Sequence, residues 1–290
     1  MRINPTFINW FKKEKISYKG IFFDIDGTIL NGGKKIQGSD NLINYLNKIN
    51  FPYIFLTNDG THSHIEKSKL FKKAGLNISP KQLISCSDGL KLLPSNKINK
   101  EKDIFFIMGD LGKPNYADDA KLKYTRDIKK LNLCKGVIIG EQNYNWEITI
   151  NSVLNFFIKN NNKVLIIPNG DSYWPKNPEE IQIGAGGIGR FIIRLLKENH
   201  IKTDFIYLGK PYKPIFSYAK DYLINKYKFK GKVNNTEFLM IGDFLKSDIY
   251  GANQNKFTSC LVLTGVTKKI HLNNIKKTSK YYPKFIFNKL

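Results

Sequence analysis

Two aspartates separated by one residue are the feature of the sequence that most directly suggests chemistry. Asp24 and Asp26 lie in the run from Phe22 to Thr28, at the end of a short apolar segment. Residues i and i+2 of a strand point to the same side, so both carboxylates can address one site. Two carboxylates this close repel each other, so the pair predicts a bound cation or a shifted pKa. One carboxylate as nucleophile and the other as acid and base would suit phosphoryl transfer through an aspartyl-phosphate.

A surface turn or a calcium-binding loop is the alternative interpretation of this pair. Gly27 would allow a sharp turn directly after the two aspartates. A calcium loop, however, requires a third acidic position and a late bidentate glutamate, and this run has neither. The calcium interpretation is therefore the weaker one.

Polar residues also follow two other short apolar segments. Thr57 and Asn58 offer a hydroxyl, an amide and backbone N–H groups at the expected start of a helix, which suits a phosphate. The same residue types also serve as ordinary helix caps. Lys210 could supply a fixed positive charge to phosphoryl oxygens, but a solvated surface lysine is the alternative in a chain so rich in lysine.

The last of these segments ends in a further carboxylate. Asp243 could complete a hard-oxygen site for Mg²⁺ together with Asp24. Asp248 would lie behind it, at or near the start of a helix. Each of the four groups follows a predicted strand, and open α/β sheets bind ligands at the carboxyl ends of their strands.

The rhythm of apolar segments predicts strands that alternate with helices, which is typical of a parallel sheet covered by helices. Near the N-terminus we expect strands over 20–24 and 52–57 and helices over 39–50 and 63–74. The middle section adds strands over 103–108, 136–140 and 163–167 and a helix over 150–159. The rhythm resumes with strands over 204–208, 237–242 and 259–264 and helices over 214–225 and 248–255.

The chemistry-bearing residues fall only in the first and last sections of the 290-residue chain. A core built from both ends, with the middle inserted as its own domain, would bring them together. We therefore predict an α/β fold with a Rossmann-like, doubly wound parallel-sheet core and a smaller inserted α/β domain. The expected boundaries give a core over 1–78 and 203–290 and an insertion over 79–202.

The charge and composition of the chain limit the kinds of binding partner that we expect. The net charge is +23, yet only four of 47 basic residues are arginine and the lysines are spread through the chain, so we expect no specific nucleic-acid partner. The apolar runs are far shorter than the about 18 residues that span a bilayer, so we expect no membrane partner. An N-terminus without a signal-peptide pattern favours a cytoplasmic location. Three scattered cysteines argue against a disulfide framework.

The ordered set of motifs resembles that of the haloacid dehalogenase superfamily of phosphohydrolases. The set consists of Asp24-x-Asp26-Gly-Thr, Thr57-Asn58, Lys210 and Gly-Asp243 with Asp248. The long middle section between the second and third motifs is similar to that of the NagD-type group. That group includes nucleotide, sugar and pyridoxal-phosphate phosphatases. The resemblance covers most of the chain, and it implies that the insertion is a cap domain that closes over the leaving group.

The resemblance also implies a mechanism. Asp24 would attack phosphorus, while Asp26 would protonate the leaving oxygen and then activate water. Mg²⁺ would be held by the carboxylates of Asp24 and Asp243 and by the backbone carbonyl of Asp26. Thr57, Asn58 and Lys210 would neutralise the phosphoryl oxygens, and Asp248 would orient the metal ligands. A small phosphorylated metabolite is the expected substrate, and the oligomeric state, including a homo-oligomer, stays open.

Two positions depart from the family pattern. Asp59 follows Thr57 and Asn58 where relatives usually carry a neutral residue, and an anion there would weaken phosphate binding unless it faces away. Where pyridoxal-phosphate phosphatases contact substrate through a cap histidine, the nearest match here is Trp174, which puts that substrate in doubt. Tyr173 and Trp174 could stack on a flat leaving group, although aromatic residues in such a loop are at least as often core.

Two other functions are compatible with parts of the sequence. The glycines from Gly184 to Gly189 satisfy a dinucleotide-binding pattern, with Asp204 twenty residues after Gly184. That pattern needs a buried strand directly before it, whereas Pro175 to Glu180 is polar, so a glycine-rich loop leading into a helix over 190–197 explains it better. A non-catalytic binding protein on the same fold is the other alternative, because a fold does not guarantee activity.

Overall fold

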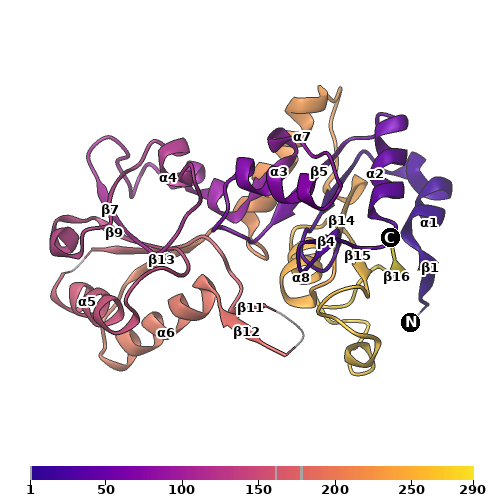
Figure 1. Ribbon diagram of the computed structural model, residues 1–290. Coiled ribbons are helices and arrows are strands. Elements are labelled where there is room, and N and C mark those ends of the chain that lie inside the picture. The colour runs from indigo at the N-terminus through magenta and orange to yellow at the C-terminus, as the bar shows by residue number, and fades with distance from the viewer. Residues whose placement is uncertain (1, 161, 177–178) are drawn as a thin grey trace. The chain divides into compact units, whose positions relative to one another are not determined.

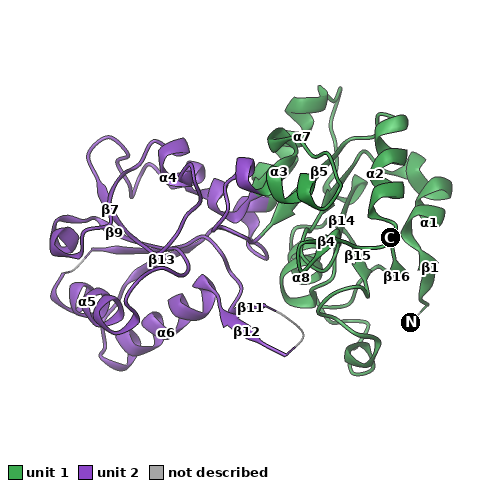
Figure 2. Cartoon of the chain, in the orientation of Figure 1, with its two compact units in different colours: residues 1–57, 67–84, 216–290 green, residues 58–66, 85–215 purple. Residues whose placement is uncertain are grey.

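The computed structural model describes residues 2–160, 162–176 and 179–290, and the chain divides into two compact units (Figure 2). Unit 1 comprises Met1–Thr57, Lys67–Ile84 and Phe216–Leu290. Unit 2 comprises Asn58–Glu66 and Ser85–Ile215. Among the described residues, no helix is both long enough and apolar enough to cross a membrane.

A seven-stranded sheet forms the centre of unit 1 (Figure 1). In spatial order its strands are β1 (Asn4–Thr6), β16 (Phe285–Lys289), β15 (Thr258–Val262), β14 (Phe238–Gly242), β2 (Gly20–Phe23), β5 (Tyr53–Thr57) and β6 (Leu83–Ser85). The pairings from β1 through to β5 are all parallel. Every residue of β2, β5, β14 and β15 is buried, as expected for a parallel sheet covered on both faces.

Helices cover both faces of this sheet because adjacent strand residues point in opposite directions. Phe23 belongs to an apolar cluster that includes Phe7 and Leu42 from two helices. The neighbouring Phe22 packs instead against Phe257, which contacts Phe216 of another helix. The sheet is therefore doubly wound, as predicted. The helices of this part of the chain are α1 (Phe7–Glu14), α2 (Ser39–Lys48), α3 (His64–Lys73), α7 (Lys213–Tyr227) and α8 (Tyr250–Gln254).

Short elements complete the connections between these helices and strands. A two-stranded hairpin consists of β3 (Leu30–Asn31) and β4 (Lys34–Lys35). A π-helical turn over Leu245–Ile249 precedes α8, so the helix expected over 248–255 is split into two segments. The 3₁₀ turns span Lys15–Ser17, Pro80–Gln82, Cys86–Leu92, Ile128–Leu133, Asn235–Glu237 and Lys269–Leu272.

Unit 2 contains a second parallel sheet with its own core. Its strands, in spatial order, are β13 (Asp204–Tyr207), β10 (Val164–Ile167), β9 (Gly136–Ile139), β7 (Ile104–Met108) and β8 (Lys123–Thr125). Apolar clusters lie on both faces, one containing Val137 and the other containing Ile138. The helices are α4 (Tyr116–Asp119), α5 (Trp146–Lys159) and α6 (Ala185–Glu198), and a hairpin consists of β11 (Tyr173–Pro175) and β12 (Ile181–Ile183). The unit is an α/β fold, as predicted for the insertion.

The strand expected over 204–208 belongs to a different sheet than predicted. It forms β13, which pairs in parallel with β10 from Val164 with Asp204 to Ile167 with Tyr207. The expectation was wrong because both sheets have the same strand–helix rhythm, and periodicity does not reveal which sheet a strand joins. The unit breaks at 84/85 and 215/216 accordingly differ from the expected boundaries at 78/79 and 202/203, and residues 58–66 also group with unit 2. That unit 2 acts as a cap stays a prediction.

The glycine run forms part of a helix and not the expected loop. Helix α6 begins at Ala185, so Gly186, Gly187 and Gly189 lie in its first turns. A Cβ atom on Gly186 would collide with the backbone of Gly170. The glycines therefore allow the helix to lie close to a neighbouring loop. Two residues of the polar segment before the run, 177 and 178, lie outside the described residues.

Candidate functional site

The carboxylates of unit 1 gather at the carboxyl ends of two neighbouring strands. Phe23 of β2 and Ile241 of β14 are register partners, and the backbone N–H of Asp24 donates to the carbonyl of Ile241 over 2.8 Å. Asp24 and Asp243 therefore leave the sheet side by side. Their exposed fractions are 7% and 1%, and that of Asp248 is 0%.

These three carboxylates form the one group of described acidic, histidine and cysteine residues that could hold a metal ion. One oxygen from each of Asp24, Asp243 and Asp248 lies within 4.8 Å of the others. Three buried negative charges this close are strongly unfavourable without a cation, and oxygen-only ligands suit a hard divalent ion. The cluster therefore fits a site for such an ion. Asp248, predicted to lie behind the metal ligands, is a member of the cluster itself.

Asp26 lies at the same strand end but differs in its environment. Its side chain is exposed, and its carboxylate is not part of the three-residue group. Its backbone forms an isolated bridge with Leu30. The sequence prediction assigned it a metal contact through its backbone carbonyl and a role in proton transfer, and both stay predictions.

Asp243 is surrounded by Gly27 and by a loop over 265–267 that the sequence analysis missed. The backbone N–H of Val266 donates to the Asp243 carboxylate, and the N–H of Thr267 donates to the Asp243 carbonyl over 3.2 Å. Gly27 has a φ of +80°, and a Cβ atom there would collide with the Asp243 carboxylate. A Cβ atom on Gly265 would collide with the same group. The signal that could have revealed this loop is its position directly after the apolar strand β15.

The predicted phosphate-binding residues occupy buried positions. Thr57 ends β5 in unit 1 with an exposed fraction of 2%. In unit 2, the side-chain amide of Asn58 holds the backbone of Lys210 from both sides, accepting from its N–H over 2.8 Å and donating to its carbonyl over 2.9 Å. Asn58 also donates to Asp171 over 2.9 Å. The structure thus brings Asn58 and Lys210 together, and the side chain of Asn58 positions the Lys210 backbone.

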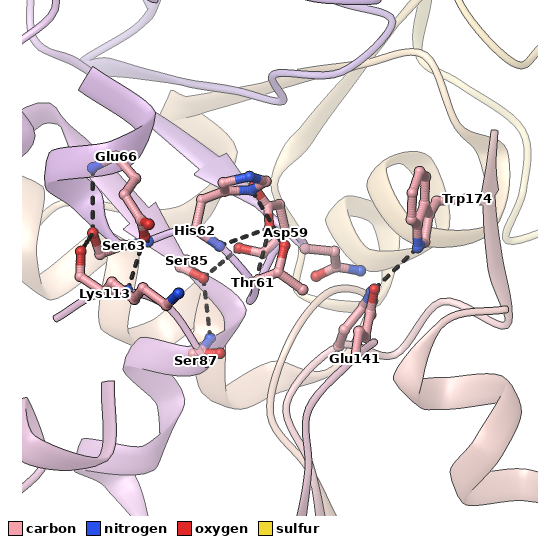
Figure 3. A network of polar contacts seen from close by, with 12 residues as sticks. Asp59, Thr61, His62, Ser63, Glu66, Ser85, Ser87, Lys113, Glu141 and Trp174 are labelled. Atoms are coloured by element: carbon pink, nitrogen blue, oxygen red, sulfur yellow. Dashed lines mark hydrogen bonds and ion pairs between the residues drawn. The ribbon is translucent and has the colours of Figure 1, made fainter. Parts of the chain in front are cut away.

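The Asp59 carboxylate accepts from donors of its own turn, while the Asp59 backbone carbonyl accepts from the Ser85 hydroxyl over 2.7 Å (Figure 3). The carboxylate accepts from the backbone N–H and hydroxyl of Thr61, each over 2.8 Å. It also pairs with the His62 ring over 2.9 Å. The carboxylate is therefore already bound by local donors, which is how a negative charge next to Asn58 is accommodated.

Trp174, the predicted leaving-group contact, lies half-buried in strand β11. Its indole Nε1 edge points at Glu141 and donates to Oε2 over 3.0 Å (Figure 3). Glu141 is itself buried, with an exposed fraction of 5%. Burial raises the pKa of this carboxyl, against the opposing effect of the hydrogen bonds from Ala185, Asn169 and Trp174. The sequence analysis missed Glu141, since a single glutamate after a strand has no distinguishing local pattern.

Known proteins share both the sequence features and the fold. Residues 21–121 match the family described as haloacid dehalogenase-like hydrolase, and residues 207–290 match one described as HAD-hydrolase-like. The mitochondrial hydrolase YKR070W of Saccharomyces cerevisiae is 26% identical, over 84% of this chain and 86% of that protein. The acid sugar phosphatase of Staphylococcus haemolyticus is 25% identical, over 87% of each.

Solved structures agree with these matches. A "possible sugar phosphatase" from Cytophaga hutchinsonii superposes with a TM-score of 0.79 at 26% identity, covering 100% of this chain and 98% of that one. NagD from Escherichia coli has the same fold, with a TM-score of 0.72 at 19% identity over 94% of this chain and 96% of that one. The predicted resemblance is therefore confirmed: the chain belongs to the haloacid dehalogenase-like hydrolases, and it shares its fold with NagD.

Proposed function

We propose that this hydrolase is a Mg²⁺-dependent phosphatase that removes phosphate from a small phosphomonoester, such as a sugar phosphate or a nucleoside monophosphate. The observation that carries the proposal is the buried group of Asp24, Asp243 and Asp248 at the ends of β2 and β14. A buried three-carboxylate cluster supplies both a nucleophile and an oxygen site for a hard cation. The named similarity to sugar phosphatases supports the choice of substrate class.

In the proposed mechanism, one Asp24 oxygen forms a bond to phosphorus while the bond between phosphorus and the leaving oxygen breaks. Asp26 donates its proton to that leaving oxygen, and its exposed position would let it reach a substrate. Asp26 then takes a proton from water, the water oxygen bonds to phosphorus, and Asp24 is released together with inorganic phosphate. A Mg²⁺ ion held by Asp24, Asp243 and the carbonyl of Asp26 would neutralise charge on the phosphoryl oxygens.

Thr57, Asn58 and Lys210 are proposed to serve the phosphoryl group. The Thr57 hydroxyl and the Lys210 ammonium are the groups suited to contact its oxygens. The contacts of the Asn58 side chain favour a positioning role, because its amide already binds the Lys210 backbone. A cytoplasmic location and the absence of nucleic-acid and membrane partners stay predictions.

Hydrolysis of p-nitrophenyl phosphate tests this function. We expect turnover that requires Mg²⁺, is abolished by a chelator and is lost in the Asp24→Asn variant. Asp119→Asn is the matched control, because it makes the same change at an exposed position on α4 and should keep full activity. Turnover that persists without a divalent ion, or in Asp24→Asn, would contradict the proposal. Phosphate-ester binding without turnover by the unaltered protein would instead favour the non-catalytic alternative.

A further inference from the structure

A loop that follows strand β15 contacts the turn that carries Asp24 and Asp26, and both segments belong to unit 1. The contact is made by Thr264, whose hydroxyl donates to the backbone carbonyl of Gly27 over 2.6 Å. The two residues are 237 positions apart in the sequence. Thr264 is half-buried, so this hydrogen bond is partly shielded from water. It therefore ties together two loops that are distant in sequence and lie beside the buried carboxylates.

The Asp243 carboxylate packs against the backbone of both of these loops. A Cβ atom on Gly27 would lie 2.4 Å from Asp243 Oδ2, and a Cβ atom on Gly265 would collide with the same oxygen. The Cβ atom on Gly265 would also lie 2.7 Å from the Cα atom of Gly27, so the two glycines pack against each other. The backbone N–H of Val266 donates to the same Oδ2 atom. The position of this carboxylate therefore depends on how the two loops lie against each other.

The loop after β15 is bound on two sides. On one side, the backbone N–H groups of Val266 and Thr267 donate to the carboxylate and the carbonyl of Asp243, which follows β14. On the other side, the Thr264 hydroxyl donates to Gly27, in the turn after β2. The loop therefore bridges the carboxyl ends of two neighbouring strands, and these strand ends supply two of the three clustered carboxylates.

We propose that Thr264 is a positioning residue, which holds the Asp243 carboxylate where it can bind a divalent cation together with Asp24. The inference rests on the proposed function, because it assigns Thr264 to the same cation site. Mg²⁺ demands near-ideal geometry from its oxygen ligands, so a small displacement of one carboxylate weakens its binding. Thr264 acts through the backbone of Gly27 and the packing of that glycine against Asp243.

Strand β15 offers a matched pair of threonines for the test. Thr264→Val replaces the hydroxyl by a methyl group of similar size and removes the hydrogen bond to the Gly27 carbonyl. Thr264→Ser keeps a hydroxyl. The control is Thr258→Val, because the Thr258 hydroxyl donates to the backbone carbonyl of Thr236 over 2.9 Å. Thr258 begins β15, so the control loses the same kind of bond at the end of the strand opposite to the carboxylates.

Binding of Mn²⁺ to the whole protein, followed by electron paramagnetic resonance, tests the positioning without any substrate. We expect Thr264→Val to bind Mn²⁺ at least about tenfold more weakly, as is typical when a group that orients a metal ligand is removed. Thr264→Ser and Thr258→Val should bind Mn²⁺ as tightly as the unaltered protein.

Two results would overturn the proposal. One is equal Mn²⁺ affinity in Thr264→Val and Thr258→Val, and the other is no Mn²⁺ binding by the unaltered protein. Urea unfolding shows whether the two variants lose similar stability, so that general destabilisation is separated from loss of positioning. If Thr264→Val does not fold, Thr264→Ala replaces it, because it removes the hydroxyl without placing a methyl group against the Gly27 carbonyl.

Turnover of p-nitrophenyl phosphate gives a second measurement. In Thr264→Val, the Mg²⁺ concentration for half-maximal turnover should rise about tenfold, while kcat at saturating Mg²⁺ changes much less. A loss of kcat that Mg²⁺ does not restore would count against positioning of the cation site. Weakened Mn²⁺ binding in Thr264→Val, in a protein without turnover, would support the role of Thr264 and contradict the phosphatase function. Mg²⁺-dependent turnover with unaltered Mn²⁺ binding in Thr264→Val would do the reverse, so the two failures are distinguishable.

Discussion

Asp88 illustrates how a single buried carboxylate is stabilised in unit 2. Its exposed fraction is 2%, and its two oxygens contact His64 Nε2 and Lys91 Nζ, each over 2.7 Å. It also accepts from the backbone N–H of Ser85 over 2.8 Å. Burial raises the pKa of Asp88, but His64 and Lys91 more than offset this effect, so the pKa is lowered overall. The carboxylate therefore contributes stability only while it is ionised.

We predict that Asp88→Asn lowers the free energy of unfolding by about 1–3 kcal/mol at pH 7, because it leaves a buried hydrogen-bonding site poorly matched. The pKa of Asp88 is lower in the folded chain than in the unfolded chain, where it is about 3.9. The ionised carboxylate therefore stabilises the fold fully above about pH 3.9, and this stability is lost as the pH falls through the pKa of the folded chain. Urea unfolding at several pH values should show the gap to the unaltered protein narrowing towards acid. Asp119→Asn should show little change at any pH, and a gap independent of pH would count against this account.

Gly27, the glycine beside the group of Asp24, Asp243 and Asp248, gives a second prediction at the scale of single residues. Gly27→Ala should lower Mg²⁺-dependent turnover at least about tenfold, because the added methyl group would displace the Asp243 carboxylate. Gly33→Ala is the matched control, since Gly33 also has a positive φ, of +75°, but has open space around it. Both variants should lose about 1 kcal/mol through backbone strain. Equal turnover by Gly27→Ala and Gly33→Ala would contradict the claim that the close packing of Gly27 against the Asp243 carboxylate is needed for activity.

Among the elements, helix α6 has the most specific packing requirement. Its first turns contain glycines because the helix lies against the loop after β10, where the backbone of Gly170 leaves no room for a side chain at Gly186. The same end of the helix presents the Ala185 N–H to Glu141. Helix α6 therefore helps to fix the loop after β10 and the hairpin of β11 and β12, whose side chains Asn169 and Trp174 donate to Glu141.

Replacing a glycine by alanine inside a helix normally stabilises it by about 1 kcal/mol. We predict the opposite for Gly186→Ala, a loss of about 1–3 kcal/mol, because overpacking against backbone cannot be relieved by a change of rotamer. Gly189→Ala should cost less, since its methyl group would meet the flexible side chain of Ile167. Urea midpoints of the two variants test this order. A Gly186→Ala variant at least as stable as the unaltered protein would refute it.

For the whole molecule, the dominant electrostatic property is its net charge of +23. A field of this sign attracts anionic phosphomonoesters and is screened over about 8 Å at physiological ionic strength. We predict that kcat/KM falls several-fold as KCl is raised from low to physiological concentration, with a smaller change in kcat. Sucrose at matched viscosity is the control for slower diffusion. A kcat/KM that does not vary with salt would show that the field has no role in substrate capture.

The fold was predictable where a local pattern specified it. The uninterrupted apolar run of β14 was expected over 237–242 and spans Phe238–Gly242, and β5 was equally clear. Helix α1 and strand β16 were missed. β16 pairs with β1 from the opposite end of the chain, as in the register of Asn4 with Phe287. Such pairing joins residues far apart in sequence, and no local pattern reports it.

The residues of the candidate site also fall into two groups, those that the sequence identified and those that only the structure identified. The sequence alone determined the family and the four strand-end motifs, because residue type and order are sufficient to recognise Asp24, Asp26, Lys210 and Asp243. Only the tertiary structure decided that Asp248 lies with the carboxylates of Asp24 and Asp243 and that Glu141 accepts a hydrogen bond from Trp174. The physical reason is that hydrogen bonds and charge clusters act over a few ångströms in space, between segments whose separation along the chain carries no record of that proximity.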